Sequence, residues 1–341
     1  MTQLRAWLRT PSAFAVAVVV VAVGIPIADG ARARAASSDG TRIIEQMRAA
    51  ASEQDFLATV DVTWRTASGE HREAMVDVGA SDGTLTLSSG SQLVLDERGH
   101  TFVKDDRSWW TPAKEPRASD PPAPDTRWRL AVHRGTTLGR PTTTVVAQRG
   151  DGSVAQRLVI DDATHVLVGR DVVASDGTIE RGFRFTSFIV GPAASGVVAD
   201  APTPDVSGRD ATELRDVSDE FDAPTTLGDG YRLVSRSAHG DAVRLVYSDG
   251  LFTLSVLEEP GELDWDALPD GGTSATVDGA RARRYAEALG DVIVWERDGV
   301  VFTSVADAPR DSYVGAMASI TAAPGVVDQV VDFVLAPFGF D

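Results

Sequence analysis

Residues 243–256 read VRLVYSDGLFTLSV, and this stretch decides the fold class. Apolar residues recur at every second position on both sides of Ser248-Asp249-Gly250, which is the pattern of two strands that each bury one face. The Asp-Gly pair favours the positive-φ backbone of a tight two-residue turn. We therefore expect a β-hairpin in which Gly250 has a positive φ, and nothing in it resembles a catalytic motif.

The same two-residue period extends over most of the chain. Between residues 56 and 64 the even positions are apolar or small, while Thr59, Asp61 and Thr63 are polar, which predicts a half-buried antiparallel strand. Further strands are expected near residues 73–78, 84–87, 92–96, 100–104, 107–110, 143–149, 153–160, 165–173, 179–189, 231–237, 242–248, 251–257, 281–286, 292–296 and 300–305. Turn signals at this spacing indicate a large, highly curved antiparallel sheet, followed by a smaller one.

Helical periodicity is confined to three places. Thr41 is a candidate N-cap for a helix over residues 41–51, whose apolar residues fall on one face. A second helix is expected over residues 311–320. A third apolar stretch, residues 326–335, has its valines on one face, which is typical of a helix that packs within the protein.

Composition shifts divide the chain into five parts. We expect a signal peptide at residues 1–35, a large β-domain at 40–192, an acidic linker with Pro and Gly at 193–222, a small domain at 223–320 and a helical tail at 321–341. Residues 111–124, TPAKEPRASDPPAP, interrupt the first domain and predict a long surface loop.

The N-terminus predicts the compartment. Arg5 and Arg9 precede 19 uncharged residues, and Ala-x-Ala sites follow at residues 31–35, as in a secretory signal. The alternative is an uncleaved anchor helix, since 19 residues approach the roughly 20 that span a bilayer. Both interpretations place residues 36–341 outside the cytoplasm, periplasmic or secreted.

Charge and cysteine content narrow the class of partner. The chain has no Cys, so disulfide and thiol chemistry are excluded. Residues 197–341 hold 27 acidic and 10 basic residues, a net charge of −17 out of −18 for the whole chain. This balance repels nucleic acid and favours a basic protein surface. The alternative is an acidic face that maintains solubility.

Two stretches carry a resemblance to a known family. YSDGLF at residues 247–252 resembles the small domain of the RseB/MucB family of extracytoplasmic regulators of anti-sigma factors. VHRGTTLGRP at residues 132–141, with the strand-like sequence that follows, resembles the large domain of that family. The resemblance implies a lipoprotein-carrier-like fold for the large domain, which is an unclosed, curved antiparallel sheet (a half-barrel) plugged by helices. The expected fold class is therefore α+β, with a second, smaller antiparallel sheet-and-helix domain.

Patterns that suggest an enzyme fail on inspection. Residues 79–83 match G-x-S-x-G, but a nucleophile elbow lies between a strand and a helix, whereas a strand follows Ser81. The five histidines show no zinc-binding spacing. Asp264, Asp266 and Asp270 lack the spacing and the final Glu of a calcium-binding loop. We predict no enzyme activity, catalytic residue, metal or cofactor.

Binding residues are predicted instead. Adjacent Trp109 and Trp110 point to opposite faces of a strand, so one is free to line a cavity unless both are packed under the loop at residues 111–124. The cavity candidates for a lipid or peptide are Trp64, Trp109, Trp110, Trp128 and Phe185. The candidates for contact with a protein partner are Tyr247, Asp249, Leu251 and Phe252.

Two functions are compatible with these residues. The resemblance implies a regulator of sigma-factor activity that binds the extracytoplasmic segment of a transmembrane anti-sigma factor, shields it from proteolysis, and is released by a lipid or other amphiphile. The alternative is a lipid or lipoprotein carrier, or a lipid-binding envelope protein. A carrier needs no second domain, so the acidic small domain favours a protein partner.

Overall fold

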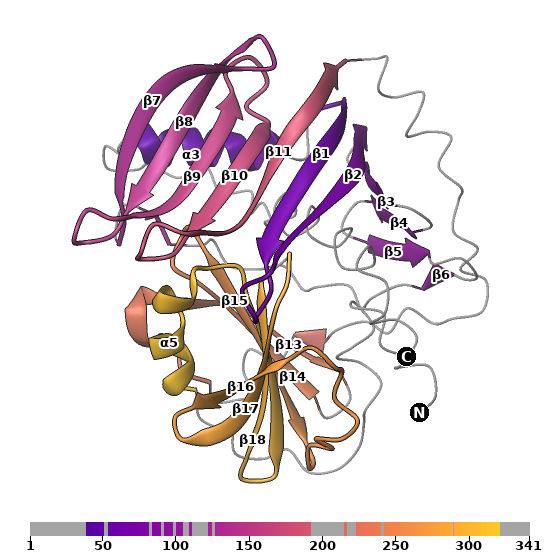
Figure 1. Cartoon of the computed structure of the whole chain (residues 1–341), viewed down its shortest axis with the longest axis vertical. Coiled ribbons are helices and arrows are strands. Elements are labelled where there is room, and N and C mark those ends of the chain that lie inside the picture. Colours follow the sequence, from indigo (N-terminus) through magenta and orange to yellow (C-terminus); the bar gives the residue numbers. More distant parts are fainter. Residues whose placement is uncertain are drawn as a thin grey trace.

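The chain folds as two antiparallel sheets. The computed structural model describes residues 39–50, 54–81, 84–89, 92–97, 100–104, 109–110, 122–124, 127–191, 215–216, 223–239, 242–288 and 290–320. The expected signal segment, the loop at residues 111–121, most of the linker and the C-terminal tail lie outside these residues. Figure 1 shows the larger sheet above the smaller one.

The large sheet has 11 strands in the order β6-β5-β4-β3-β2-β1-β11-β10-β9-β8-β7, and its two end strands do not pair with each other. Neighbouring strands are antiparallel, and most of them are consecutive in the chain; the one long-range pairing joins β1 to β11. The strands are β1 Phe56–Arg65, β2 His71–Ser81, β3 Thr84–Ser89, β4 Gln92–Glu97, β5 His100–Lys104, β6 Trp109–Trp110, β7 Arg129–Thr137, β8 Arg140–Gln148, β9 Val154–Asp161, β10 Leu167–Val173 and β11 Ile179–Val190.

The small sheet has eight strands in the order β12-β13-β14-β15-β19-β18-β17-β16. It is also antiparallel, with β15 against β19 as its central long-range pair. The strands are β12 Arg215–Asp216, β13 Arg232–His239, β14 Ala242–Ser248, β15 Thr253–Pro260, β16 Thr273–Val277, β17 Ala280–Ala286, β18 Asp291–Arg297 and β19 Val300–Ala306.

Alternation of side chains builds the core of each sheet. Along β1 the residues at even positions from Phe56 to Trp64 are buried, and the intervening positions are only partly so. Pairing sets β1 residues beside equivalent positions of β11, for example Val62 beside Phe183. The large core therefore follows directly from the two-residue period of the sequence.

Helices are few among the described residues. Helix α3, Asp39–Ala50, packs against β7 and β8, and its buried face includes Ile43, Ile44 and Met47. A short 3-10 turn η3, Arg310–Ser312, leads into helix α5, Val314–Ala318, which covers one face of the small sheet. The expected plug of several helices in the large sheet is thus reduced, in the part of the chain described, to the single helix α3.

Several local predictions are confirmed and some need correction. Gly250 has a φ of 88°, as expected. The pairing of Ser248 with Thr253 leaves four residues in the turn rather than two, because the Asp249 carboxylate accepts the amides that follow it. Helix α3 begins at Asp39 and buries Thr41, so Thr41 is not its cap. Strands β7, β12 and β16 were not among the expected strands, and β12 lies within the expected linker.

Candidate functional site: the junction between the two sheets

The turn between β14 and β15 points into the large-sheet half of the protein. Asp249 is 1% exposed, and its Oδ1 accepts the backbone N–H groups of Leu251 at 2.9 Å and Phe252 at 2.8 Å. Its Oδ2 accepts two bonds from the other half, from Arg127 Nη1 at 2.9 Å and Trp128 Nε1 at 3.1 Å. One carboxylate therefore shapes the turn and holds it against the large-sheet half.

The backbone at Gly250 fits closely against its neighbours. A Cβ at this position would overlap the carbonyl oxygen of Pro122 and lie 2.9 Å from the nitrogen of Pro124. Arg48 of α3 donates a hydrogen bond to the Gly250 carbonyl. Glycine is thus required at position 250 for two reasons: the positive φ, and the close approach of the backbone at Pro122 and Pro124.

Aromatic packing surrounds this contact. The Phe252 ring lies edge-on to Trp128, with 5.4 Å between the ring centroids. The Arg127 guanidinium lies 4.8 Å from the centroid of Trp128 and 5.4 Å from that of Tyr231. The Tyr231 hydroxyl is buried and has no hydrogen-bond partner among the described residues. The carboxylate side of the ion pair is thus shielded from water, which strengthens the pair.

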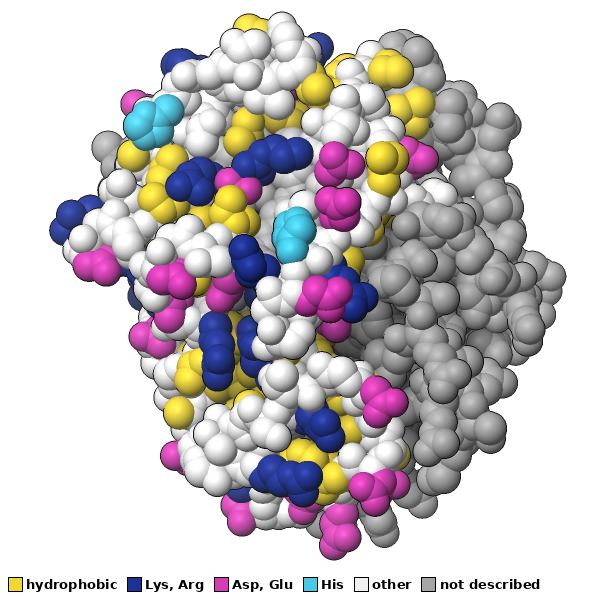
Figure 2. Space-filling model, in the orientation of Figure 1, with side chains coloured by type: hydrophobic (Ala, Val, Ile, Leu, Met, Phe, Trp, Pro, Cys, Tyr) yellow, Lys and Arg dark blue, Asp and Glu magenta, His cyan; other side chains and the backbone are white. Residues whose placement is uncertain are grey.

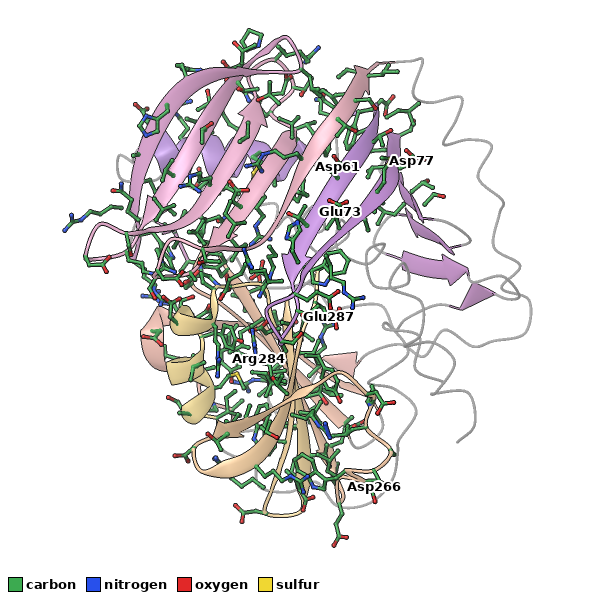
Figure 3. All side chains as sticks on the ribbon, viewed as in Figure 1. Asp61, Glu73, Asp77, Asp266, Arg284 and Glu287 are labelled. Atoms are coloured by element: carbon green, nitrogen blue, oxygen red, sulfur yellow. The ribbon has the colours of Figure 1, made fainter. Side chains whose placement is uncertain are left out.

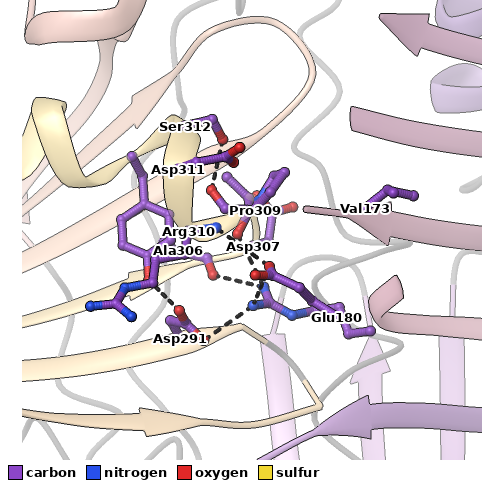
Figure 4. Close-up of polar contacts among 12 residues, drawn as sticks. Val173, Glu180, Asp291, Ala306, Asp307, Pro309, Arg310, Asp311 and Ser312 are labelled. Carbon is purple, nitrogen blue, oxygen red and sulfur yellow. Dashed lines mark hydrogen bonds and ion pairs between the residues drawn. The ribbon is translucent and has the colours of Figure 1, made fainter. Parts of the chain in front are cut away.

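Among the described residues, three more ion pairs cross the junction. Like Arg127 and Asp249, each joins an arginine of the large-sheet half to an aspartate of the small-sheet half. They are Arg170–Asp307 at 3.0 Å, Arg181–Asp291 at 3.2 Å and Arg149–Asp311 at 3.1 Å. Figure 4 shows the acceptors around η3, where Arg181 also donates to the Ala306 carbonyl and Glu180 accepts the Arg310 amide. Arginines of the large-sheet half therefore neutralise part of the negative charge of residues 197–341 inside the protein.

Asp291 is the most crowded acceptor of the junction. It is fully buried and pairs with Arg181 from β11 and with Arg284 from β17, and it accepts the Tyr313 hydroxyl bond. Figure 3 shows Arg284 in the small sheet beside the contact with the large one. Burial raises the pKa of Tyr313, and the nearby Asp291 carboxylate raises it further. The Tyr313 hydroxyl is consequently a permanent donor to Asp291 at neutral pH.

Burial also shifts the junction carboxyls. It raises the pKa of Asp249, although the turn amides and Arg127 act in the opposite direction. It raises the pKa of Glu180 as well, against the nearby Arg181. Multiple donors to each carboxylate offset this cost of burial, as buried ion pairs require.

The candidates for partner contact all lie in this junction or beside it. Tyr247, Leu251 and Phe252 are buried with Asp249, so none of the four is on the surface in this arrangement. The side-chain alternation that predicted the hairpin says which face is buried, but it does not distinguish a sheet core from a contact with another domain. The arginines of the large-sheet half were missed altogether.

The cavity candidates divide into two groups. Trp64, Trp128 and Phe185 are buried, and Phe185 packs in a cluster of tilted rings with Phe56, Phe183 and Phe188. The indole Nε1 of Trp64 has no hydrogen-bond partner among the described residues. Trp109 and Trp110 form β6 beside β5, and their side chains lie outside the description. The structure therefore brings three of the five into the interior and leaves the role of the other two a prediction.

The residues of the patterns considered for enzyme activity have defined structural positions. Ser81 ends β2 and pairs with Thr84 of β3, so it belongs to a hairpin as expected. Asp264 accepts the amides of Asp266 and Ala267 in a loop. No cluster of potential metal ligands occurs within the described residues.

Comparison with known proteins gives structural likeness only. The sequence matches no protein-family model and no curated protein. The chain is similar to a chain of the Pseudomonas aeruginosa MucA/MucB complex, with 17% identity over 83% of this chain and 99% of that one, at a TM-score of 0.49. MucB solved in complex with MucA(peri) shows 16% identity over 83% and 98%, at 0.46.

An uncharacterized conserved protein from Thermus thermophilus matches at 12% identity over 49% of this chain and 96% of that one, with a TM-score of 0.34. At these values the fold is best described by the strand order and register of the chain itself. Among the described residues, no helix has the length and hydrophobicity needed to cross a membrane.

Proposed function

We propose that this protein is an extracytoplasmic, non-enzymatic regulator that binds the extracytoplasmic segment of a transmembrane anti-sigma factor. MucB was solved in complex with MucA(peri), and the proposal gives this chain a partner of the same class. The assignment rests on the residues of the two stretches that resemble the RseB/MucB family, and on what those residues build.

The observation that carries the proposal is the position of the YSDGLF stretch. These residues form the turn that joins the two sheets through Asp249, Gly250 and Phe252. The second stretch, at residues 132–141, forms the hairpin of β7 and β8. A resemblance confined to exposed loops would say little, but residues that fix the relative position of two domains support a common architecture.

Charge supports a protein partner. Four of the carboxylates in the acidic half are neutralised by arginines across the junction. Others remain exposed on the loop between β15 and β16, namely Glu262, Asp264, Asp266 and Asp270. Figure 3 shows Asp266 at the far end of the small sheet, away from the junction. We propose that this loop attracts a basic or mixed-charge segment of the anti-sigma factor.

The finer parts of the proposal concern regulation. Binding would protect the anti-sigma factor from proteolysis, and a lipid or other amphiphile entering the large domain would release it. The aromatic cluster around Phe185 offers an apolar lining for an acyl chain, provided that side chains move to admit it. Because the sheets are joined by buried contacts, such movement would be transmitted to the small sheet.

Affinity capture tests the partner class. The full chain, immobilised and exposed to detergent-solubilised envelope membranes, should retain a single-span protein whose cytoplasmic part binds a sigma factor. Recovery of no such protein would contradict the proposal. Recovery of lipids or lipoproteins alone, seen by native mass spectrometry, would favour a lipid carrier instead.

Charge neutralisation then tests the surface. Glu262→Gln, Asp266→Asn and Asp270→Asn together should slow association, and the effect should be largest at low salt. At physiological salt, attraction beyond a Debye length of about 8 Å is screened. The matched control neutralises the same number of acids on the large sheet, Asp61 of β1 and Glu73 and Asp77 of β2, all labelled in Figure 3. Equal slowing by both sets would indicate a general charge effect with no defined surface.

A further inference from the structure

Four strands form the edges of the two sheets, and one of them differs from the rest. Within the described residues, strands β6 and β12 have two residues each and β16 has five. Strand β7, at the other end of the large sheet, has nine. Short edge strands limit unwanted pairing with other chains, so three edges follow this rule and β7 does not.

The β7 edge has charged side chains but lacks two other common forms of protection, a proline and a bulge. It contains no proline, and its pairing with β8 runs from Arg129 opposite Gln148 to Thr137 opposite Arg140 without a register shift, hence without a bulge. No described strand pairs with its outer side. In Figure 1 it forms the outer edge of the large sheet, in front of α3, which supports its inner face.

The hairpin geometry identifies which backbone groups face outward. Leu138 and Gly139 both have positive φ, which is a two-residue turn whose flanking residues, Thr137 and Arg140, form a hydrogen-bonded pair. The next pair, Thr136 and Pro141, is then non-hydrogen-bonded; consistently, the Pro141 carbonyl accepts the Asp162 amide on the side away from β7. The outward groups therefore belong to alternate residues, Leu130, Val132, Arg134 and Thr136.

The side chains of β7 select the chemistry of a partner. The strand contains Arg129, His133 and Arg134 and no acidic residue, and all three are exposed. Arg134 pairs with Asp162, whereas Arg129 and His133 have no ion-pair partner among the described residues. A second copy of this strand would bring further basic residues and no acidic residue to pair with Arg129 or Arg134. Figure 2 shows hydrophobic side chains interspersed with basic ones over the upper part of this view.

We propose that β7 accepts an extended acidic peptide segment, which adds as a twelfth strand to the large sheet. Backbone hydrogen bonds to Leu130, Val132, Arg134 and Thr136 would supply affinity, as in other strand-addition complexes. Acidic side chains opposite Arg129 and His133 would supply selectivity. This surface is distinct from the acidic loop of the small sheet and does not depend on the identity of the anti-sigma factor.

Synthetic peptides test the proposal on the purified full chain. The probe is a capped peptide of the length of β7 in which Glu alternates with Val and Thr, and its counterpart has Lys in place of Glu. Anisotropy should show that the Glu peptide binds at least about tenfold more tightly than the Lys peptide, and less tightly as salt is raised. Amide exchange at Val132 and Arg134 should slow when the Glu peptide is bound.

Two substitutions at one position separate strand addition from charge attraction alone. Thr136→Pro removes an outward N–H without touching the β7–β8 ladder, and should weaken the Glu peptide about tenfold, equivalent to about 1.4 kcal/mol. Thr136→Val keeps the N–H and should bind like the wild type. Equal binding by the two variants, once both are shown to be folded, overturns strand addition. Failure of the wild type to bind the Glu peptide, or equal binding of Glu and Lys peptides, overturns the proposed partner chemistry.

Discussion

Replacing Asp249 by Asn is the sharpest test of the junction. The amide oxygen of Asn can still accept the Leu251 and Phe252 amides. Its NH₂ group, however, takes the position of Oδ2 and faces two donors, Arg127 Nη1 and Trp128 Nε1. The substitution therefore preserves size and the turn, and removes only the contacts that join the two halves.

The expected loss follows from burial. Arg127 would keep its charge at a site where its side chain is 21% exposed, and would lose its carboxylate. Hydrogen bonds to a charged group contribute about 1.5–3 kcal/mol each, and removing one partner of a buried ion pair costs about 3–5 kcal/mol. Two lost bonds would give about 3–6 kcal/mol, which overlaps that range, so we expect the free energy of unfolding to fall by about 3–5 kcal/mol.

Urea unfolding of the full chain measures this, with tryptophan fluorescence and circular dichroism as separate probes. The matched control is Glu70→Gln, which breaks the exposed pair with Arg72 and should cost less than about 1 kcal/mol. We further expect the two probes to separate in Asp249→Asn, because the sheets would no longer unfold together. If Asp249→Asn unfolds within about 1 kcal/mol of the wild type, the junction does not hold the domains as described.

Three further predictions concern other sites. Gly250→Ala should destabilise the protein by more than Gly299→Ala. Both glycines have a positive φ, but only at position 250 would the new Cβ meet the backbone of Pro122. Equal urea midpoints for the two variants would refute the close contact. Burial raises the pKa of Glu259 from 4.5 to about 7. A carboxyl whose pKa is higher in the folded than in the unfolded protein lowers the free energy of unfolding as pH rises from about 4.5 to about 7. Unfolding measured at several pH values should therefore show a smaller loss of stability over this range in Glu259→Gln than in the wild type. Ser81→Ala should leave ligand binding and any hydrolytic background unchanged, and loss of an esterase activity in this variant would show that Ser81 is not simply a hairpin residue.

Local patterns in the sequence predicted the sheets well because strands that bury one face impose a two-residue period. The even positions of β1 and the arms of the β14–β15 hairpin are examples, and the structure buries the expected residues. The period failed at β7, where alternation is weak because most positions are exposed. An edge strand with little buried surface leaves little hydrophobic signal.

The junction could not be predicted in the same way. Its arginines are far apart in sequence, on α3, before β7, after β8, and on β10 and β11, and each looks like an ordinary surface charge. These arginines come together only because β11 pairs with β1 and the small sheet lies against the end of the large one. The excess of Asp and Glu in one half was visible, but its internal use depends on tertiary structure.

The junction also changes where partners should be sought. The hairpin is buried between the two sheets and holds the surfaces around it in a fixed relation. Direct contact of the hairpin with a partner would require the ion pairs of Asp249, Asp291, Asp307 and Asp311 to open together. The free energy needed to open several buried ion pairs is larger than the free energy that an exposed loop gains from contact with a charged partner. Binding surfaces are therefore better sought at exposed elements at either end of the molecule, the acidic loop between β15 and β16 and the basic edge of β7. Because the junction keeps these two surfaces in a fixed relation, a single extended partner with a basic and an acidic segment would gain from engaging both at once.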